Sequence, residues 1–333
     1  MKKNLFFFLV LSLSLVAFAM GTREANDNRV VVYAYDSFTS EWGPGPELEK
    51  RFEAETGYDL EFVTFNDAPN ILTQAIAEGK NCPADILLGI DNFLYFQAKE
   101  ADILKAYKPK NASRISSQEL IFDKDFLLTP YDYGYFAFMY DTTSKLAAPK
   151  SLEDLCDERF TKSVVIMDPR TSTPGQGLLM WTRAVYGDRY LDFWKKFKPS
   201  ILTMSPGWSA GYGLFTAGEA PLALSYSSSE AYHVLYDKTN RYKALVFDEG
   251  HIMQVEGLGL MKTAHNEKGA KAFIDFMLSE SAQAVLPETQ WMYPVALEAI
   301  LPSSYMNVAV PKKVLKISED PQHVIDALIE VLR

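Results

Sequence analysis

Acidic residues follow three hydrophobic runs in the first third of the chain. Asp36, Asp67 and Asp91 each stand within two residues of the end of such a run. If the runs are parallel strands, their carboxyl ends meet at one edge of the sheet, where open α/β sheets bind ligands. Carboxylates there would hold a cation or a ring that carries hydrogen-bond donors. An Asp after a strand also commonly caps the next helix, and Asp91 fits that structural role best.

A second candidate is the turn Asp168–Gly177, which joins a strand-like run to an amphipathic helical pattern. Thr173 fits as its N-cap, Pro174 as the first helical residue, and Gln176 completes a capping box. Backbone N–H groups at such a helix start can hold a hydroxyl or phosphate oxygen. On spacing alone, the segment is an ordinary capped turn.

Aromatic residues gather in the same loops. They are Tyr35, Trp42, Trp208, Tyr226, Tyr232 and Trp291. Small residues such as Gly43 and Gly207 stand beside them and have little bulk with which to bury them. Indole and phenol faces attract cations by about 0.5–2 kcal/mol each when desolvated, and they stack on flat heterocycles. The pattern favours a flat, cationic ligand.

The elements that must position these residues alternate between strand-like and helix-like patterns. Predicted strands cover 30–35, 59–65, 84–90, 163–167, 201–204 and 221–226, and helical patterns begin near residues 46, 69, 93 and 175. Strand–helix–strand repeats of this length need parallel strands with right-handed crossovers.

Two longer extended runs, 130–140 and 251–261, are predicted to cross between two lobes. Two crossings make a hinge, and a hinge makes a cleft. We therefore predict an α/β, two-lobed fold. Residues 29–130 and 257–333 form the first lobe, on which amphipathic helices at 270–278 and 323–332 pack, and residues 131–256 form the second.

The N-terminus has the parts of a secretion signal. Lys2 and Lys3 precede an apolar run over 5–17, and Ala17-Phe18-Ala19 supplies a small-x-small cleavage pattern. The run is shorter than the ~20 residues that span a bilayer, and no cysteine follows it for lipid attachment. We predict that residues 1–19 are removed and that the mature chain is periplasmic.

The net charge of the chain limits the classes of partner that it favours. The chain has 33 basic and 43 acidic residues, a formal net charge of −10. This balance disfavours nucleic acid and anionic membranes as partners and mildly favours a cationic ligand.

Several blocks, taken together, resemble the thiamine-binding periplasmic proteins of bacterial ABC importers. They are residues 33–38, 42–46, 132–140, 168–177, 207–209, 224–226, 231–233 and 291–294. The resemblance implies a type II periplasmic binding protein fold that captures thiamine, or its mono- or diphosphate, and delivers it to the importer's permease. It implies no catalytic residue, metal or cofactor, and we expect a monomer.

The resemblance also implies roles for the acidic loop and the aromatic wall. Asp67 and Ala68 meet the aminopyrimidine ring, with Asp67 accepting a hydrogen bond from its amino group. Trp208, Tyr226 and Trp291 stack on or enclose the rings, and Tyr35, Trp42 and Tyr232 complete the wall. The family usually has glycine after the acidic residue, whereas Ala68 and Pro69 follow here, so the backbone of this loop differs.

For the polar end of the ligand, the resemblance implies two further segments. Ser172 and Thr173 hold the hydroxyethyl or phosphate group, and the backbone of Ser227, Ser228 and Ser229 adds polar contacts.

An enzyme is one alternative, because thiamine-degrading enzymes share this architecture and use a cysteine nucleophile. Cys82 precedes its strand, and Cys156 lies in a helical segment over 152–160. Neither is placed to attack a bound ligand, and two separate buried thiols are expected rather than a disulfide.

A binding protein for another ligand is a second alternative. An acidic rim with aromatic walls also suits a polyamine, and Tyr226 with Tyr232 could supply phenolates to ferric iron. A ferric site would need further oxygen or imidazole ligands, and the four histidines are scattered singly. A purely structural role is disfavoured by the export signal and the cleft.

Overall fold

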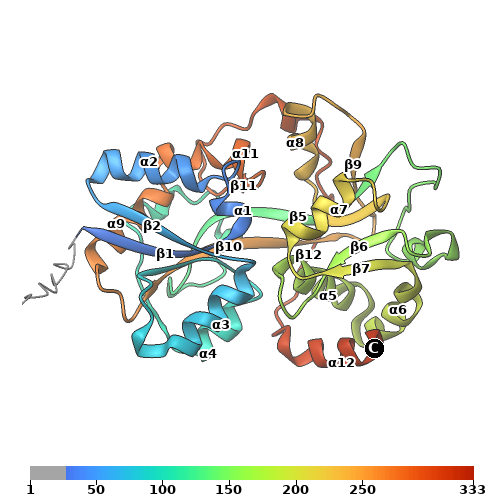
Figure 1. The fold of residues 1–333 in the computed structure, drawn as a ribbon, viewed down its shortest axis with the longest axis horizontal. Coiled ribbons are helices and arrows are strands. Elements are labelled where there is room, and N and C mark those ends of the chain that lie inside the picture. The colour runs from blue at the N-terminus through green and yellow to red at the C-terminus, as the bar shows by residue number, and fades with distance from the viewer. Residues whose placement is uncertain (1–27) are drawn as a thin grey trace, which may run out of the picture.

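One sheet runs through both lobes of the computed structural model, which describes residues 28–333. The predicted signal, residues 1–19, lies outside the described residues. The strand order is β2-β1-β3-β10-β5-β8-β6-β7, and Figure 1 shows helices above and below it on either side of a waist crossed by β5 and β10. Within residues 28–333 no helix combines the length and hydrophobicity needed to cross a bilayer.

The first lobe follows the predicted strand–helix alternation. Its strands are β1 (Arg29–Tyr35), β2 (Asp59–Phe65) and β3 (Ile86–Asp91), with β1 parallel to both others. Its helices are α1 (Asp36–Thr39), α2 (Gly45–Thr56), α3 (Ala68–Glu78) and α4 (Tyr95–Glu100). Strand β1 is buried on both faces, as its unbroken apolar sequence requires. Gly57 ends α2 in the left-handed conformation, with φ +75°.

Strands β5 (Thr129–Asp141) and β10 (His251–Met261) connect the lobes and pair antiparallel with each other. The first half of β5 also pairs with β11 (Tyr293–Pro294), and its second half pairs with β8 (Leu222–Tyr226) and β9 (Tyr242–Leu245). Strand β10 also pairs antiparallel with β3 and with the short β4 (Leu104–Lys105). The predicted boundaries at 130/131 and 256/257 fall within these strands and stay a prediction.

The second lobe places a parallel trio of strands between helices. The strands are β6 (Val164–Met167), β7 (Ile201–Ser205) and β8, with β6 parallel to both others. The helices are α5 (Thr173–Tyr186), α6 (Tyr190–Phe197), α7 (Trp208–Thr216) and α8 (Ser229–Leu235). Trp181 and Trp194 are fully buried in its core.

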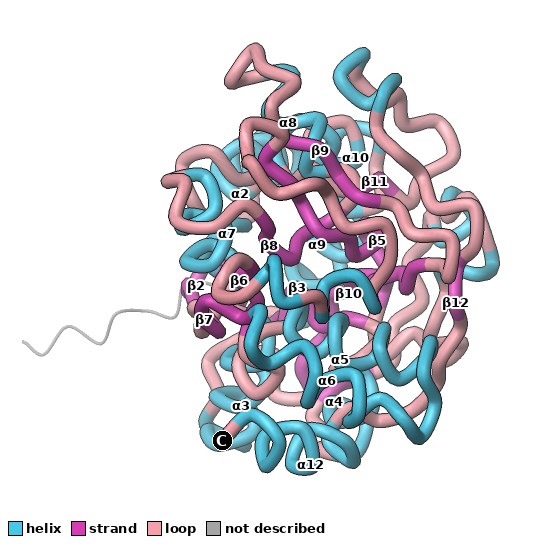
Figure 2. The backbone as a smooth tube through the Cα atoms, turned by 90° about the vertical axis from the view of Figure 1, so that its right-hand side faces the viewer, coloured by secondary structure: helices cyan, strands magenta, loops and turns pink. Residues whose placement is uncertain are grey.

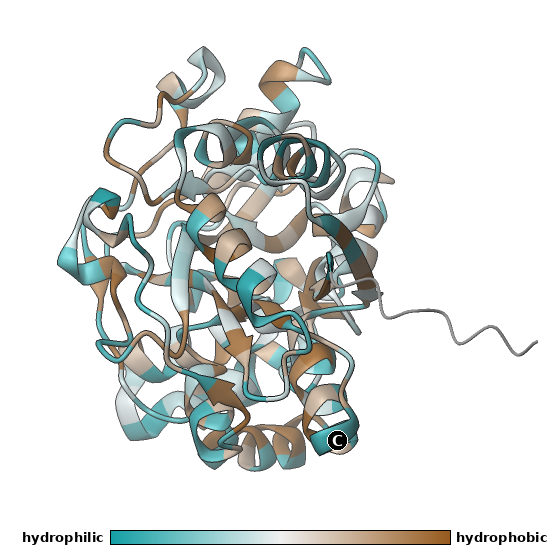
Figure 3. Cartoon of the chain, turned by 90° about the vertical axis from the view of Figure 1, so that its left-hand side faces the viewer, coloured by the Kyte–Doolittle hydropathy of each residue, from teal (hydrophilic) through white to brown (hydrophobic). Residues whose placement is uncertain are grey.

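The C-terminal region divides between the lobes. Helix α9 (Glu267–Met277) buries Phe273 and Ile274 in the same core as β1, followed by α10 (Glu280–Gln283) and α11 (Leu286–Thr289). Figure 3 shows brown, apolar segments inside this lobe and teal, polar ones on its outer helices.

The last helix, α12 (Gln322–Leu332), packs against α6 instead, and Figure 2 shows it below α5 and α6. Its Leu328 lies in the core that contains Trp194. The prediction that residues 323–332 pack on the first lobe is therefore wrong. An amphipathic pattern shows that a helix has an apolar face, but not which lobe that face covers. Here β12 (Val314–Leu315) pairs with the start of β10 and leads the chain to the second lobe.

Candidate functional site

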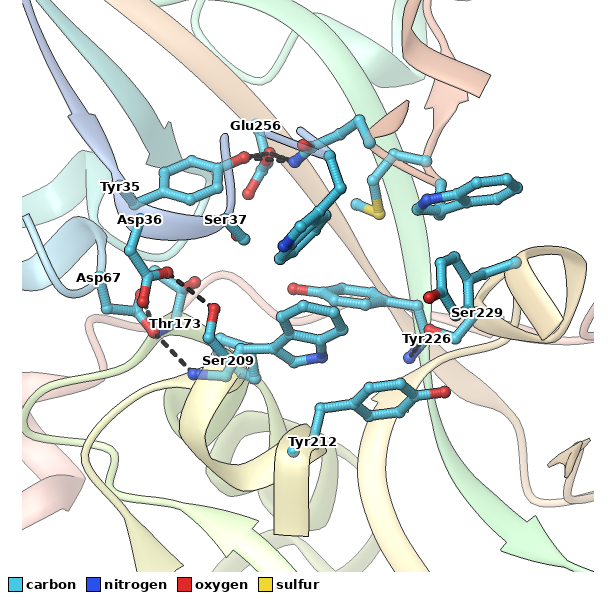
Figure 4. Close-up of a pocket in the computed structure, with 18 of the residues that line it drawn as sticks. Tyr35, Asp36, Ser37, Asp67, Thr173, Ser209, Tyr212, Tyr226, Ser229 and Glu256 are labelled. Atoms are coloured by element: carbon cyan, nitrogen blue, oxygen red, sulfur yellow. Dashed lines mark hydrogen bonds between the residues drawn. The ribbon is translucent and has the colours of Figure 1, made fainter. Parts of the chain in front are cut away.

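A cavity of about 260 Å³ lies between the lobes and takes its lining from both. The first lobe contributes the residues after β1 and β2, and the second lobe contributes the starts of α5 and α7. Strand β10, the end of β8, helix α8 and the segment 290–292 complete it. Figure 4 shows the carboxylates of Asp36, Asp67 and Glu256 on one side and Tyr226 with Ser229 on the other. The volume is near the lower end of small-molecule sites, about 300 Å³.

Most of the predicted site residues line this cavity. They are Tyr35, Trp42, Asp67, Thr173, Trp208, Tyr226, Ser229, Tyr232 and Trp291. Four others do not line it and are buried: Ala68, Ser172, Ser227 and Ser228.

Asp67 joins three helix N-termini. Its Oδ1 accepts hydrogen bonds from the backbone N–H of Ala68 at 2.8 Å and of Thr173 at 3.2 Å, and its Oδ2 accepts one from Trp208 N–H at 3.4 Å. Burial raises the pKa of Asp67 to about 6, and these donors oppose that rise. One carboxylate of the first lobe therefore holds the starts of α5 and α7 of the second.

This arrangement corrects the predicted cap of α5. Ser172, not Thr173, is the N-cap residue, and its side chain makes no capping bond. The Thr173 N–H instead reaches Asp67 across the cleft. The spacing of a local capping box could not reveal an acceptor supplied by the other lobe.

The other two aspartates differ from each other. Asp91 accepts hydrogen bonds from the N–H groups of Phe93 and Leu94 at 3.0 and 2.9 Å, so it holds the turn before α4 and does not cap the helix itself, whose N-cap residue is Leu94. Asp36 lines the cavity and accepts a hydrogen bond from Ser209 Oγ at 2.8 Å, a second link between the lobes.

Stacked aromatic rings form one wall of the cavity. The Trp208 indole lies on the Tyr212 ring at 4.9 Å and 15°, and its Nε1 donates to Ser225 Oγ at 2.9 Å. Trp42 lies 6.4 Å from Trp208 and is 51% exposed. Tyr212 is held in turn by a hydrogen bond between its hydroxyl and His233 Nε2 at 2.7 Å. The wall is thus fixed from behind but open to a ligand from the cleft.

Trp291 belongs to a second aromatic group. It meets Tyr232 edge-on at 5.4 Å, and its backbone is left-handed, with φ +61°. Such a conformation costs a residue with a side chain on the order of 1–3 kcal/mol and often marks a functional site. The indole lines the cavity.

Glu256 lies between the two walls and was not predicted. Its Oε2 accepts hydrogen bonds from Tyr35 at 2.7 Å and Tyr131 at 2.8 Å, and Gln290 also donates to it. A sequence signal for it did exist, since an acidic residue interrupts the apolar part of the run 251–261.

The lining carries negative charge without a compensating base. Asp36, Asp67 and Glu256 line the cavity, and no Lys, Arg or His does so in the described part of the chain. Buried carboxylates need a partner. The cavity is therefore suited to a cation that brings its own hydrogen-bond donors.

The cysteines do not form a reactive site. Both are free, and neither lines the cavity. Burial raises the pKa of Cys82 to about 11 and that of Cys156 to about 12, so neither is a thiolate near neutral pH. Cys156 ends a short 3-10 turn, Glu153–Cys156, and the predicted helical segment is two such turns.

Ferric iron is poorly matched by the tyrosines. Tyr226 donates a hydrogen bond to Gln254 at 2.6 Å, and burial raises its pKa well above the ordinary value, which opposes phenolate formation. His251 is bonded to Phe136 O and Phe247 N–H, away from the cavity. No group of three or more His, Cys, Asp or Glu suited to a metal occurs between residues 28 and 333.

Comparisons with known proteins identify the family of the chain. Residues 81–317 match the family model of the bacterial extracellular solute-binding proteins. A thiamine-binding periplasmic protein of Brucella melitensis is 40% identical over 291 residues, 87% of this chain and 86% of that one. One of Escherichia coli is 39% identical over 288 residues, 86% of each chain.

A solved periplasmic thiamin binding protein superposes with a TM-score of 0.86 at 37% identity, covering 92% of this chain and 95% of that one. The chain belongs to the thiamine-binding periplasmic protein family. As a member of this family of solute-binding proteins, it has the predicted two-lobed α/β fold, which the structural likeness confirms.

Proposed function

We propose that the chain captures thiamine in the interlobe cavity and delivers it to the permease of an ABC importer. The observation that carries the proposal is a cavity with aromatic walls and three carboxylates but no basic residue among the residues of 28–333 that line it. Thiamine has two flat aromatic rings, of which the thiazolium is permanently cationic, so it satisfies both features. The membership of a thiamine-binding family supports the same ligand.

Within the cavity, the aminopyrimidine amino group donates to Asp67, and Trp208, Tyr226 and Trp291 stack on or enclose the rings. Tyr35, Trp42 and Tyr232 complete the wall. Ala68 supports the acidic loop, since it is buried and lines no part of the cavity itself.

The hydroxyethyl or phosphate end lies toward Ser172 and Thr173, with the backbone of Ser227, Ser228 and Ser229 nearby. Thiamine monophosphate and diphosphate are therefore further candidate ligands. We also propose that the chain acts in the periplasm after residues 1–19 are removed, as a monomer, and without catalysis.

Calorimetric titration of the purified chain tests the ligand. Thiamine should bind at one molecule per chain. The same titration with thiamine monophosphate and diphosphate compares the affinities of the three ligands. Spermidine and ferric citrate serve as comparison ligands, and tighter binding of either would contradict the proposal. Chromatography of the recovered thiamine checks for catalysis, because any free pyrimidine product would show an enzyme.

A further inference from the structure

Two buried carboxyl groups face each other on the strands that connect the lobes. Glu256 of β10 is paired in register with Asp132 of β5, and they are 5% and 0% exposed. The register of β10 shifts between Glu256 and Gly257. Such a bulge re-aims the neighbouring side chain. Glu256 lines the cavity beside Tyr35 (Figure 4), whereas Asp132 does not line it.

The two carboxyls have different surroundings. Tyr35, Tyr131 and Gln290 all donate to Glu256 Oε2. Neither oxygen of Asp132 receives a hydrogen bond from any donor in the described residues. Two adjacent buried carboxyls cannot both ionise without a large cost, so one proton stays on the pair. The donors favour charge on Glu256 and leave the proton on Asp132.

The pKa shifts agree with this division. Burial, followed by the charge of Glu256, raises the pKa of Asp132 well above its ordinary value. Burial raises the pKa of Glu256 only to about 7, because the two phenols oppose it, while Asp91 on β3 raises it further. The phenols of Tyr35 and Tyr131 stay protonated, since burial raises their pKa as well.

Glu256 is also less engaged across the cleft than the other lining carboxylates. Asp67 and Asp36 already accept hydrogen bonds from Thr173, Trp208 and Ser209 of the second lobe. The hydrogen-bond donors to Glu256 lie instead on β1, on β5 and just before β11. Its charge is therefore held in place independently of the contacts that join the lobes.

We propose that Glu256, with Asp132 as its protonated partner, is the residue that selects for a positive charge on the ligand. The inference rests on the proposed function and assigns recognition of the thiazolium charge to strand β10. A cation beside Glu256 favours its ionised form. When Glu256 is partly protonated, binding should therefore release its proton. The affinity should fall as the pH falls below about 7.

The test compares thiamine with its uncharged pyrimidine half, 4-amino-5-hydroxymethyl-2-methylpyrimidine. Glu256→Gln keeps the size of the side chain and an acceptor for the phenols. It should lower thiamine affinity on the order of 10- to 100-fold at pH 8, and the affinity of the neutral half by less than about 3-fold. Asp85→Asn is the matched control. Asp85 is also buried, but it lies directly before the start of β3, at the end of the strand away from Asp91, and it does not line the cavity. Asp85→Asn should leave both affinities unchanged.

Equal losses for both ligands, or no loss for either, would overturn the assignment of Glu256. If the unmodified chain fails to bind thiamine, the proposed function fails by itself. The role of Glu256 is then tested with spermidine, whose affinity Glu256→Gln should still lower, and an unchanged spermidine affinity would overturn it.

A measurement on the unmodified chain does not depend on how the variant folds. Calorimetry at pH 7 in two buffers of different ionisation enthalpy should show release of a fraction of a proton on thiamine binding. Asp132→Leu, which is close to Asp in size, should move the pH at which affinity falls to a higher value, because the Asp132 carboxyl lowers the pKa of Glu256. No proton release, together with affinity that is flat between pH 6 and 8.5, would overturn the inference.

Discussion

Replacement of Asp67 by alanine should weaken ligand binding far more than it weakens the fold. The change removes the acceptor of three backbone N–H groups, at 2.8, 3.2 and 3.4 Å. The bond to Ala68 caps α3 within the first lobe, and its loss costs about 1 kcal/mol of stability. The bonds to Thr173 and Trp208 cross the cleft, so their loss acts on lobe closure.

The size of the closure effect follows from these two bonds. A hydrogen bond to a charged group contributes about 1.5–3 kcal/mol, and the 3.4 Å bond belongs at or below the lower end. In the open form, water can satisfy the freed N–H groups. Closure should therefore become less favourable by roughly 3 kcal/mol, which lowers the affinity of a ligand that needs the closed form about 100-fold. The lost contact with the aminopyrimidine adds to this.

Calorimetry measures the affinity, small-angle X-ray scattering measures the opening of the lobes, and thermal unfolding measures stability. Ser279→Ala is the control, because Ser279 caps α10 through Ala282 N–H without touching the second lobe. Ser279→Ala should lower stability by about as much as the loss of the Asp67 cap on α3 does, and it should leave the ligand affinity unchanged. A less than 3-fold effect of Asp67→Ala on affinity would refute the reasoning.

Three further predictions concern other parts of the structure. Trp208→Ala should lower thiamine affinity by on the order of 1–3 kcal/mol, as measured by calorimetry, and unchanged affinity would remove the indole from the site. Burial lowers the pKa of His251 to about 4. Its neutral form therefore supports the fold above pH 6.5, and this support, on the order of 3 kcal/mol, is lost as the pH falls from 6.5 to 4. Urea unfolding should show that the free energy of unfolding falls with pH in this range in the unmodified chain but not in His251→Gln. Equal dependence on pH in the two chains would contradict the prediction. Leu328→Ala should lower unfolding stability by about 2–5 kcal/mol, since Leu328 is fully buried against the second lobe; a cost below 1 kcal/mol would show that α12 does not pack there.

The strands and the helices between them were predictable because each is a local pattern. Val30, Val31 and Val32 form an unbroken β-branched run, and the strand they predict is buried on both faces. The two connecting strands were also visible, since 13 and 11 extended residues are long for strands within one lobe.

Features that depend on contacts between residues far apart in the sequence were harder to predict. The face of α12 could have covered either lobe, and only the pairing of β12 with β10 decides it. Likewise, Asp67 holds Thr173 from 106 positions away, which no local capping rule describes. Glu256 stands in the middle of a strand and not at its end, where the carboxyl ends of parallel strands predict a site, and a bulge within β10 turns it toward the cavity.

The central claim is tested most directly by adding thiamine to the purified chain and recording tryptophan fluorescence. Three of the five tryptophans, Trp42, Trp208 and Trp291, line the cavity, whereas Trp181 and Trp194 are buried in the second lobe. Thiamine should cause a saturable change that ends at one equivalent and disappears largely in Trp208→Ala. A signal that does not saturate, or that Trp208→Ala leaves intact, would contradict the capture of thiamine in this cleft.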